Sequence, residues 1–302
     1  MLSPGSPTFK ANRPGEQVAR LASHSLLAVH GPDAAAFLQA QTMNDVLALA
    51  PGQWQWNGWL SAKGRVVALF ALLRAQQERF LVVLPDFPAE RLRAGWQTYV
   101  FRSKLRIELE SALACAAQWP SDSARIDAPT PEQAQGDEQR GWRLDMGGDG
   151  GARVLWLLPG EAMPATGEGD VAARWRDDDI AHGLPRLPPE GVEAWTPQML
   201  SLERLAAFSL KKGCYPGQEI VARTHYLGKA KRGLLRVGGQ GLASGQALLA
   251  ASGGELGQLA CTSEDGRQGL AVAAIDRVGD EMVVAGAPVH ALPLLDGLRR
   301  PL

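Results

Sequence analysis

Apolar and polar residues up to residue 109 follow the periods of several strands and two helices. The stretch 17–29 has a mixed strand pattern, and 54–60 alternates large apolar with polar residues, as in a half-buried strand. Asp33 is placed to cap a helix over 34–41, because its carboxylate can accept hydrogen bonds from the free N–H groups of the first turn. The remaining predicted elements are strands over 66–73, 79–84 and 105–109, and a helix that begins at Pro88, with Leu92, Trp96 and Tyr99 on one face.

The later part of the chain is richer in turns. The segment 120–151 is rich in Pro, Gly and polar residues, which indicates an exposed loop or an excursion within a domain, and a strand is predicted over 153–158. Pro197 marks the first turn of a helix over 198–208. After Arg232, short apolar segments alternate with glycine-containing turns, which is typical of a small closed or nearly closed β-barrel. Its predicted strands are 234–237, 247–249, 257–262, 269–275, 282–284 and 289–292.

Length and composition fit a compact α+β protein of about two domains. Of the 302 residues, 45% are hydrophobic and 21% are charged, as in globular proteins. We place an α+β region at 15–232 and the barrel at 233–302. The net charge of −1 provides no general attraction to nucleic acid or anionic lipid. Since neither a signal segment nor a run of about 18 apolar residues occurs, we expect a cytoplasmic protein without a membrane partner.

The three cysteines are Cys115, Cys214 and Cys261, and no two of them form a C-x-x-C pair. This spacing argues against a disulfide framework and against a zinc site, and the histidines also lack a metal-binding spacing, so no metal is predicted. Cys115 and Cys261 have no polar neighbours in sequence and are interpreted as core residues.

Cys214 stands in the densest chemical pattern of the chain, the segment 211–219. Gly213 and Gly217 allow a tight backbone path around it, and Pro216 can start a helix over 218–225. The positive end of that helix and the nearby cations favour the thiolate form of the sulfur, which is the nucleophile and metal ligand. A small buried residue in a turn is the alternative interpretation of this cysteine. The cations concerned are Lys211, Lys212 and Arg223.

This segment strongly resembles the signature K-G-C-Y/F-x-G-Q-E of the YgfZ family. Every fixed position is filled, by Lys212, Gly213, Cys214, Tyr215, Gly217, Gln218 and Glu219. The resemblance continues over about residues 17–292, in Gly31 to Gln41, Asp45, Lys63-Gly64-Arg65, Gly183-Leu184-Pro185, Pro197-Gln198, Ala222-Arg223-Thr224 and Gly228-Lys229.

Membership of this family implies the fold of the aminomethyltransferase of the glycine cleavage system. That fold is a three-lobed disc with a ferredoxin-like part, a C-terminal β-barrel and a central tetrahydrofolate pocket. YgfZ proteins are implicated in the assembly or repair of iron–sulfur clusters and, through cluster enzymes, in tRNA methylthiolation. The resemblance therefore implies an accessory protein without turnover of its own, with Cys214 and Lys212 as its reactive pair. It also implies folate and iron–sulfur client or assembly proteins as partners.

A site for tetrahydrofolate, or for a one-carbon derivative of it, needs apolar walls and cations for its carboxylates. Aromatic candidates for the walls are Trp54, Trp56, Trp59 and Tyr215, although each tryptophan can equally belong to the core. Cationic candidates are Lys63, Arg65 and Arg223.

The alternative function is a folate-dependent aminomethyltransferase. Such enzymes carry an acidic residue in the strand after a Gly-Gly turn, and alignment with Gly64-Arg65 puts Ala68 and Leu69 there instead. A second carboxylate would fall near Ala181, with the acidic residues 177–179 close by. The transferase is therefore the weaker prediction.

Direct RNA binding is not expected either. The basic group of Lys229, Lys231 and Arg232 has no interleaved aromatic residues and is better explained as solvated surface.

Overall fold

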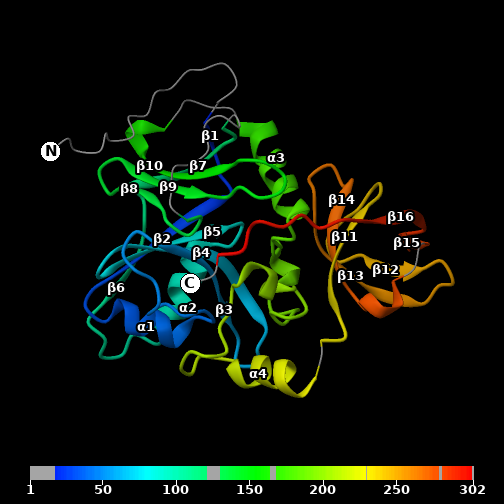
Figure 1. Cartoon of the computed structure of the whole chain (residues 1–302), viewed down its shortest axis with the longest axis horizontal. Coiled ribbons are helices and arrows are strands. Elements are labelled where there is room, and N and C mark those ends of the chain that lie inside the picture. Colours follow the sequence, from blue (N-terminus) through cyan, green and yellow to red (C-terminus); the bar gives the residue numbers. More distant parts are fainter. Residues whose placement is uncertain (1–17, 121–129, 164–167, 229, 279–280, 301–302) are drawn as a thin grey trace.

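The computed structural model describes residues 18–120, 130–163, 168–228, 230–278 and 281–300. Two five-stranded sheets and a closed barrel make up three bodies, with the barrel to the right in Figure 1. The predicted α+β class is confirmed, because helices pack on antiparallel sheets and the barrel follows as a separate sheet.

The first sheet has the strand order β3-β4-β5-β2-β6 and is antiparallel throughout. Its central strands β4 and β5 are apolar over most of their length because both faces of the sheet are buried. Helices α1 and α2 cover one face, and the other face turns toward the second sheet. The elements are β2 (His24–His30), α1 (Ala34–Gln41), β3 (Trp54–Leu60), β4 (Val66–Gln76), β5 (Arg79–Pro85), α2 (Ala89–Gln97) and β6 (Arg106–Leu109).

The second sheet has the order β1-β7-β10-β9-β8, and helix α3 (Glu168–Ala181) packs beside it. The predicted single strand over 17–29 is wrong, since a turn at 22–23 divides β1 (Ala19–Arg20) from β2 and sends them to different sheets. The predicted loop 120–151 is also wrong in its described part. Residues from 130 onward include two strands, of which the second, over 141–145, has buried side chains, and 121–129 lie outside the described residues. The remaining strands are β7 (Leu113–Gln118), β8 (Gln135–Asp137), β9 (Gly141–Asp145) and β10 (Val154–Pro159).

The barrel closes in the order β11-β14-β13-β12-β15-β16, as the glycine-punctuated pattern predicts. Its first strand begins at Gly233, while the division of the chain into domains at this point stays a prediction. The strands are β11 (Gly233–Gly238), β12 (Ala247–Ala250), β13 (Glu255–Thr262), β14 (Gln268–Ala273), β15 (Met282–Val284) and β16 (Ala287–Leu292).

Four local predictions are wrong, each because a tertiary contact overrides the local pattern. Asp33 precedes α1 but makes no cap, because its carboxylate accepts from the backbone N–H of Lys104 instead. Tyr99 lies beyond the end of α2 and is exposed. Strand β3 is buried almost throughout rather than half-buried, since both of its faces are covered.

The fourth wrong prediction is the helix over 198–208. That stretch holds only a 3-10 turn, η4 (Leu202–Leu205), between Ser201 and Ala206, which both have positive φ. The hydroxyl of Ser201 accepts from Leu234, and the carbonyl of Ala206 accepts from Asn44, so both breaks are fixed by long-range contacts. The other 3-10 turns are η2 (Gly160–Ala162), η3 (Pro189–Gly191) and η5 (Ile275–Arg277).

After β16 the chain returns from the barrel to the middle of the molecule as an irregular segment, 293–300, which we call the return segment (red in Figure 1). It bonds in turn to the end of α3, to the loop after β9 and to η4. In the described part of the chain no helix is long and apolar enough to span a membrane.

Candidate functional site

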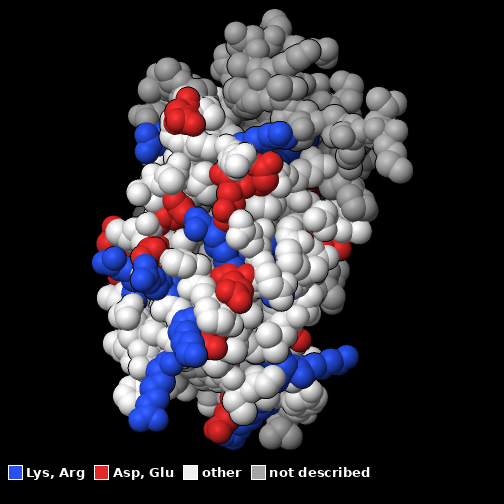
Figure 2. Space-filling model, turned by 90° about the vertical axis from the view of Figure 1, so that its left-hand side faces the viewer, with Lys and Arg blue, Asp and Glu red and all other residues white. Residues whose placement is uncertain are grey.

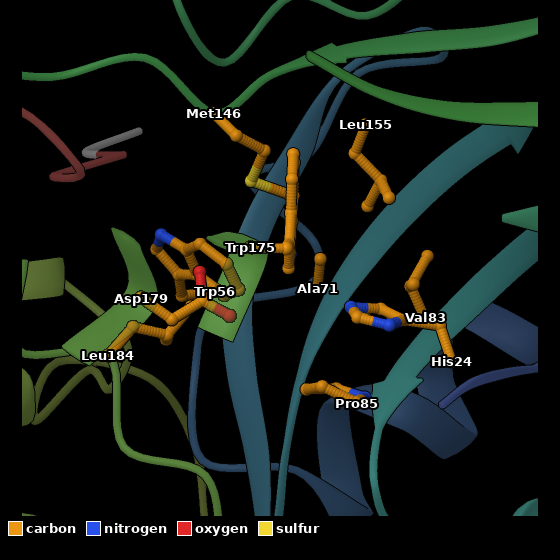
Figure 3. Close-up of a pocket in the computed structure, with 10 residues that line it drawn as sticks. All are labelled: His24, Trp56, Ala71, Val83, Pro85, Met146, Leu155, Trp175, Asp179 and Leu184. Carbon is orange, nitrogen blue, oxygen red and sulfur yellow. The ribbon is translucent and has the colours of Figure 1, made fainter. Parts of the chain in front are cut away.

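A cavity lies between the two sheets and against α3 (Figure 3). It contains about 280 Å³ of space not filled by atoms, part of it open to solvent. The walls are mostly apolar, with two indole rings and two ionisable groups among them. The lining residues are His24, Trp56, Ala71, Val83, Pro85, Met146, Leu155, Trp175, Asp179 and Leu184.

Asp179 is the one carboxylate among these lining residues, and it is almost completely buried. One oxygen accepts from Arg153 at 2.6 Å and the other from Arg186 at 2.6 Å. Arg186 also reaches Asp86 at 2.8 Å, so a buried network of opposite charges stiffens this wall. Burial, reinforced by Arg186, holds the pKa of His24 well below its ordinary value, so this imidazole is neutral at pH 7.

The return segment forms a further wall beside the cavity. The indole N–H of Trp56 donates to the carbonyl of Leu298 at 2.8 Å, and Leu298 itself is buried. The guanidinium of Arg300 lies over the ring of Trp54 and donates to backbone carbonyls, including that of Asp145 at 2.7 Å. Burial lowers the pKa of Arg300 to about 10, and in the described part of the chain it pairs with no carboxylate.

A second feature is the loop that carries Cys214, residues 211–217, which we call the cysteine loop. Lys212 anchors it: the side chain is buried, and its ammonium donates to the carbonyl oxygens of Gln39, Thr42 and Asn44 around the end of α1. Carbonyl oxygens at a helix C-terminus carry partial negative charge, which suits a cation. Tyr215 packs under the same ammonium, 4.9 Å from it to the ring centroid.

Cys214 is exposed, whereas Cys115 and Cys261 are buried as predicted. Burial raises the pKa of the Cys115 thiol to about 12 and that of Cys261 to about 11, which keeps both protonated and unreactive at pH 7. The alternative of a buried Cys214 in a turn is therefore wrong. The predicted helix after the loop is α4 (Gln218–Leu227), and it begins four residues after the cysteine.

The cysteine loop also touches the turn between β3 and β4. Gly217 and Gly64 both have positive φ, and a Cβ on Gly217 would lie 2.6 Å from the Cα of Gly64. Only glycine fits both conditions without a shift of the backbone, so these two turns hold each other in place.

Comparison with known proteins decides the family. A tRNA-modifying protein YgfZ from Vibrio vulnificus is 31% identical over 234 residues, which cover 74% of this chain and 70% of that protein. This chain belongs to the YgfZ family. An uncharacterized protein from Haemophilus influenzae is also 31% identical, over 227 residues that cover 72% of each chain. No protein-family model matches the sequence.

A solved structure confirms the predicted fold of this YgfZ protein. The glycine cleavage system aminomethyltransferase T from Bartonella henselae superposes with a TM-score of 0.73, over 94% of this chain and 86% of that one, at 18% identity. Low identity with high coverage indicates a shared fold and carries no conclusion about a shared reaction.

Of the tryptophans predicted to stack on a folate, only Trp56 lines the cavity of this YgfZ protein. Trp54 is fully buried behind it, at 5.2 Å between ring centroids. Trp59 points to the opposite face of the sheet and packs on Gly95 of α2, because side chains alternate along a strand. Trp59 therefore does not line this cavity.

The predicted cations and the aromatic Tyr215 also lie away from the lining residues. Lys63 and Arg223 are exposed, and Arg65 donates to the carbonyl of Ala194 at 2.6 Å. Tyr215 is buried, and burial raises its pKa to about 12. Gly213 and Glu219 are exposed, while Gln218 donates to the carbonyl of Lys212. The roles predicted for the YgfZ signature residues stay predictions.

Asn44 links the cysteine loop of this YgfZ protein to the cavity. Its carbonyl accepts from Lys212, and its side-chain amide donates to the carbonyl of Trp56 at 2.9 Å. A ligand that displaces Trp56 would therefore also move Asn44, whose carbonyl accepts from Lys212. Asn44 was not predicted, and its place between two apolar stretches offers no periodic signal.

His24, Met146, Trp175, Asp179 and Leu184 also line the cavity without having been predicted as site residues. Trp175 and Asp179 are four residues apart and so share one face of α3. That spacing could have revealed them, had a helix been recognised there. Among the described residues of the YgfZ chain, no group of three or more His, Cys, Asp and Glu is arranged to hold a metal ion.

Replacement of Lys212 by Met should make the free energy of unfolding respond differently to pH. Burial lowers the pKa of Lys212 from 10.5 to about 7, although Asp45 opposes the shift. Between these two values the unfolded chain binds the proton and the folded chain does not, so this lysine's contribution to stability rises with pH. We expect urea unfolding to show that the free energy of unfolding of wild type increases relative to that of Lys212→Met from pH 7 to pH 10.

The matched control is Lys211→Met, because the neighbouring Lys211 is exposed. Its difference from wild type should be flat over the same pH range. A flat difference for Lys212→Met as well would contradict the lowered pKa of Lys212.

Proposed function

We propose that this protein binds tetrahydrofolate, or a one-carbon derivative of it, in the cavity and supports the assembly or repair of iron–sulfur clusters. The clients are cluster enzymes, including those that methylthiolate tRNA, and Cys214 is the residue that acts on the cluster. The observation that carries the proposal is the exposed thiol of Cys214, held by the buried Lys212 within the complete YgfZ signature. The names of the relatives, which are tRNA-modifying proteins, support the link to tRNA.

The residues around the cavity fit a reduced pterin with an aminobenzoyl-glutamate tail. Trp56 and Trp175 offer aromatic surfaces, and Asp179 offers a carboxylate that can accept from ring N–H groups. Arg300 is a buried cation close by whose present partners are carbonyl oxygens, and a ligand carboxylate would be a stronger partner. Only about 10 Å³ of the cavity is open to a water-sized molecule, far below the roughly 300–1,000 Å³ usual for ligand pockets, so its walls must move apart to admit the ligand.

Cys214 can act as a transient ligand of a cluster. An exposed thiol that loses its proton to solvent becomes a thiolate, the form that binds iron. One thiolate cannot complete the coordination of a cluster, which takes four protein ligands, so the others must come from the client. This arrangement suits transfer or repair and is not that of a resident cluster.

The alternative, a folate-dependent aminomethyltransferase, is less well supported. Ala68 and Leu69 stand where the sequence places the catalytic acid of such enzymes. The one carboxylate among the lining residues, Asp179, is held by two arginines. The second carboxylate of such enzymes would align near Ala181, where this sequence has none. Asp179, two residues earlier on α3, lines the cavity instead.

Titration with tetrahydrofolate, followed by tryptophan fluorescence, tests the proposed site. We expect a saturable change in emission whose amplitude falls in Trp56→Phe and in Trp175→Phe, because these two indoles line the cavity. Trp96→Phe is the matched control, since Trp96 is buried in the other core, between the first sheet and α2. An unchanged amplitude in both cavity variants would place the ligand elsewhere, and turnover with lipoyl carrier protein would identify a transferase instead.

A further inference from the structure

The loop between α2 and β6, residues 98–105, presents large aromatic side chains to solvent. Phe101 is 85% exposed and Tyr99 is 53% exposed. Phenylalanine seldom stands so far out of a soluble protein unless it has a partner, because its exposure forgoes the free energy of burial. The loop lies on the side of the molecule that faces the viewer in Figure 2, beside β6.

The same part of the chain carries only positive charge. From residue 91 to residue 107 there is no Asp or Glu, and the basic residues there are all exposed. Since the whole chain has a net charge of −1, this is a local concentration of cations. Lys and Arg side chains project from the lower half of the face in Figure 2, between mostly neutral surface and a few acidic groups. The basic residues are Arg91, Arg93, Arg102, Lys104 and Arg106.

Contacts with the core hold this loop in shape. The backbone N–H of Lys104 donates to the carboxylate of Asp33 at 2.6 Å, and the neighbouring Leu105 packs against the core below α2. The guanidinium of Arg102 lies over the ring of Phe101, 5.1 Å from its centroid. Phe101 is thus presented by a fixed backbone and is already paired with a cation on one face.

Three acidic residues border these five cations and leave the surface positive. The carboxylate of Asp33 accepts from the backbone of the loop, and that of Glu108 on β6 pairs with His30 at 2.9 Å and also interacts with Arg106. Glu90, at the start of α2, stands before the basic stretch rather than within it. The loop therefore offers a positive surface around two aromatic rings.

We propose that this loop, with the basic face of α2, binds a single-stranded region of RNA. Phosphates require cations, and unpaired bases stack on aromatic or guanidinium planes, so the two properties together match single-stranded nucleic acid. An acidic protein would satisfy the cations but would need a broader apolar centre than two rings and the edge residue Leu109. The inference goes beyond the proposed function, since it needs neither the cavity nor Cys214, and it departs from the expectation of no direct RNA contact. That expectation rested on the group at 229–232, of which Lys229 lies outside the described residues.

Fluorescence anisotropy with a labelled single-stranded RNA oligonucleotide tests the proposal on the full chain. Phe101→Ala should weaken binding about tenfold, from the loss of one stacked base, and Phe101→Tyr should restore it. Lys104→Gln should weaken binding and lower the slope of log affinity against log salt by about 0.7, from the loss of one phosphate contact. Arg140→Gln is the matched control, because Arg140 is an exposed arginine in the turn between β8 and β9.

Three outcomes would overturn the proposal. The first is equal binding of the RNA by wild type and by Phe101→Ala. The second is equal affinity for heparin, a polyanion without bases, since this would reduce the loop to a general anion site. The third is binding to vesicles of anionic lipid, with the same dependence on Phe101 and no RNA binding. None of these results touches the folate titration, so failure here is distinguishable from failure of the proposed function.

Discussion

Cys214→Ala is expected to abolish the recovery of iron–sulfur enzyme activity in a strain that lacks this protein. The thiol is exposed in the middle of the cysteine loop, which the buried Lys212 holds against the end of α1. Its removal therefore takes away the one accessible sulfur among the three cysteines. Because the side chain makes no core contact, the free energy of unfolding should change by less than about 0.5 kcal/mol. The measurement is client enzyme activity in cell extract, with the variant expressed at the level of wild type.

The matched control keeps Cys214 and removes the other two thiols. Cys115→Ala with Cys261→Ala should lower stability, since both side chains are buried, yet still restore client activity at a temperature where the protein is folded. Full recovery with Cys214→Ala would remove this residue from the mechanism. It would leave the folate titration and the fold unaffected.

Asp179→Ala is expected to cause the largest loss of stability of any single change at the cavity. The carboxylate is buried between Arg153 and Arg186, each also almost completely buried. Its removal leaves two guanidinium groups in the interior with less compensation, and breaking a buried ion pair in this way costs about 3–5 kcal/mol. Urea unfolding at pH 7 measures the loss.

The comparison for Asp179 is Asp137→Ala, a half-exposed aspartate in the edge strand β8. There the expected loss is only about 1 kcal/mol, because the exposed carboxylate gives up just the hydrogen bonds that it accepts from the backbone N–H groups of Gln139 and Arg140. Similar small losses for both variants would contradict the view of Asp179 as the centre of a buried charge network. Asp179→Asn should fall between them, since the amide keeps one acceptor oxygen.

The sequence predicts those elements in which the spacing of apolar residues is set by contact with one hydrophobic core. The helix over 34–41 matches α1, and each predicted barrel strand overlaps a strand of the barrel. Glycine turns and apolar runs suffice there, because each strand pairs with neighbours in the same sheet. Strands β4 and β5 were visible for a different reason, because burial of both faces makes each an almost continuous apolar run.

Most of the second sheet was not predicted, and its composition explains why. Strands β7 and β9 are short, and β9 lies in a segment dominated by Gly, Asp and Gln, which resembles a loop. Helix α3 contains Asp177, Asp178 and Asp179 in succession, so its apolar face is hard to see. Its burial depends on the arginines that meet it from elsewhere in the chain, which no local pattern records.

The candidate site was also predicted only in part. Cys214 was found because a motif is contiguous in sequence, and its exposure agrees with the prediction. Of the predicted wall residues, Trp56 lines the cavity while Trp59 points to the other core, although both fit an aromatic wall by composition. Only the register of β3 decides which face each takes.

The return segment has a consequence for biosynthesis. Residues 293–300 supply the carbonyl that holds the indole of Trp56, yet they leave the ribosome after both sheets and the barrel strands have been made. Until they are synthesised, the cavity is incomplete, and its apolar walls are exposed to chaperones or to a ligand. Completion of this cavity therefore depends on a segment that follows the barrel in the chain, and not only on packing of the two sheets that surround it.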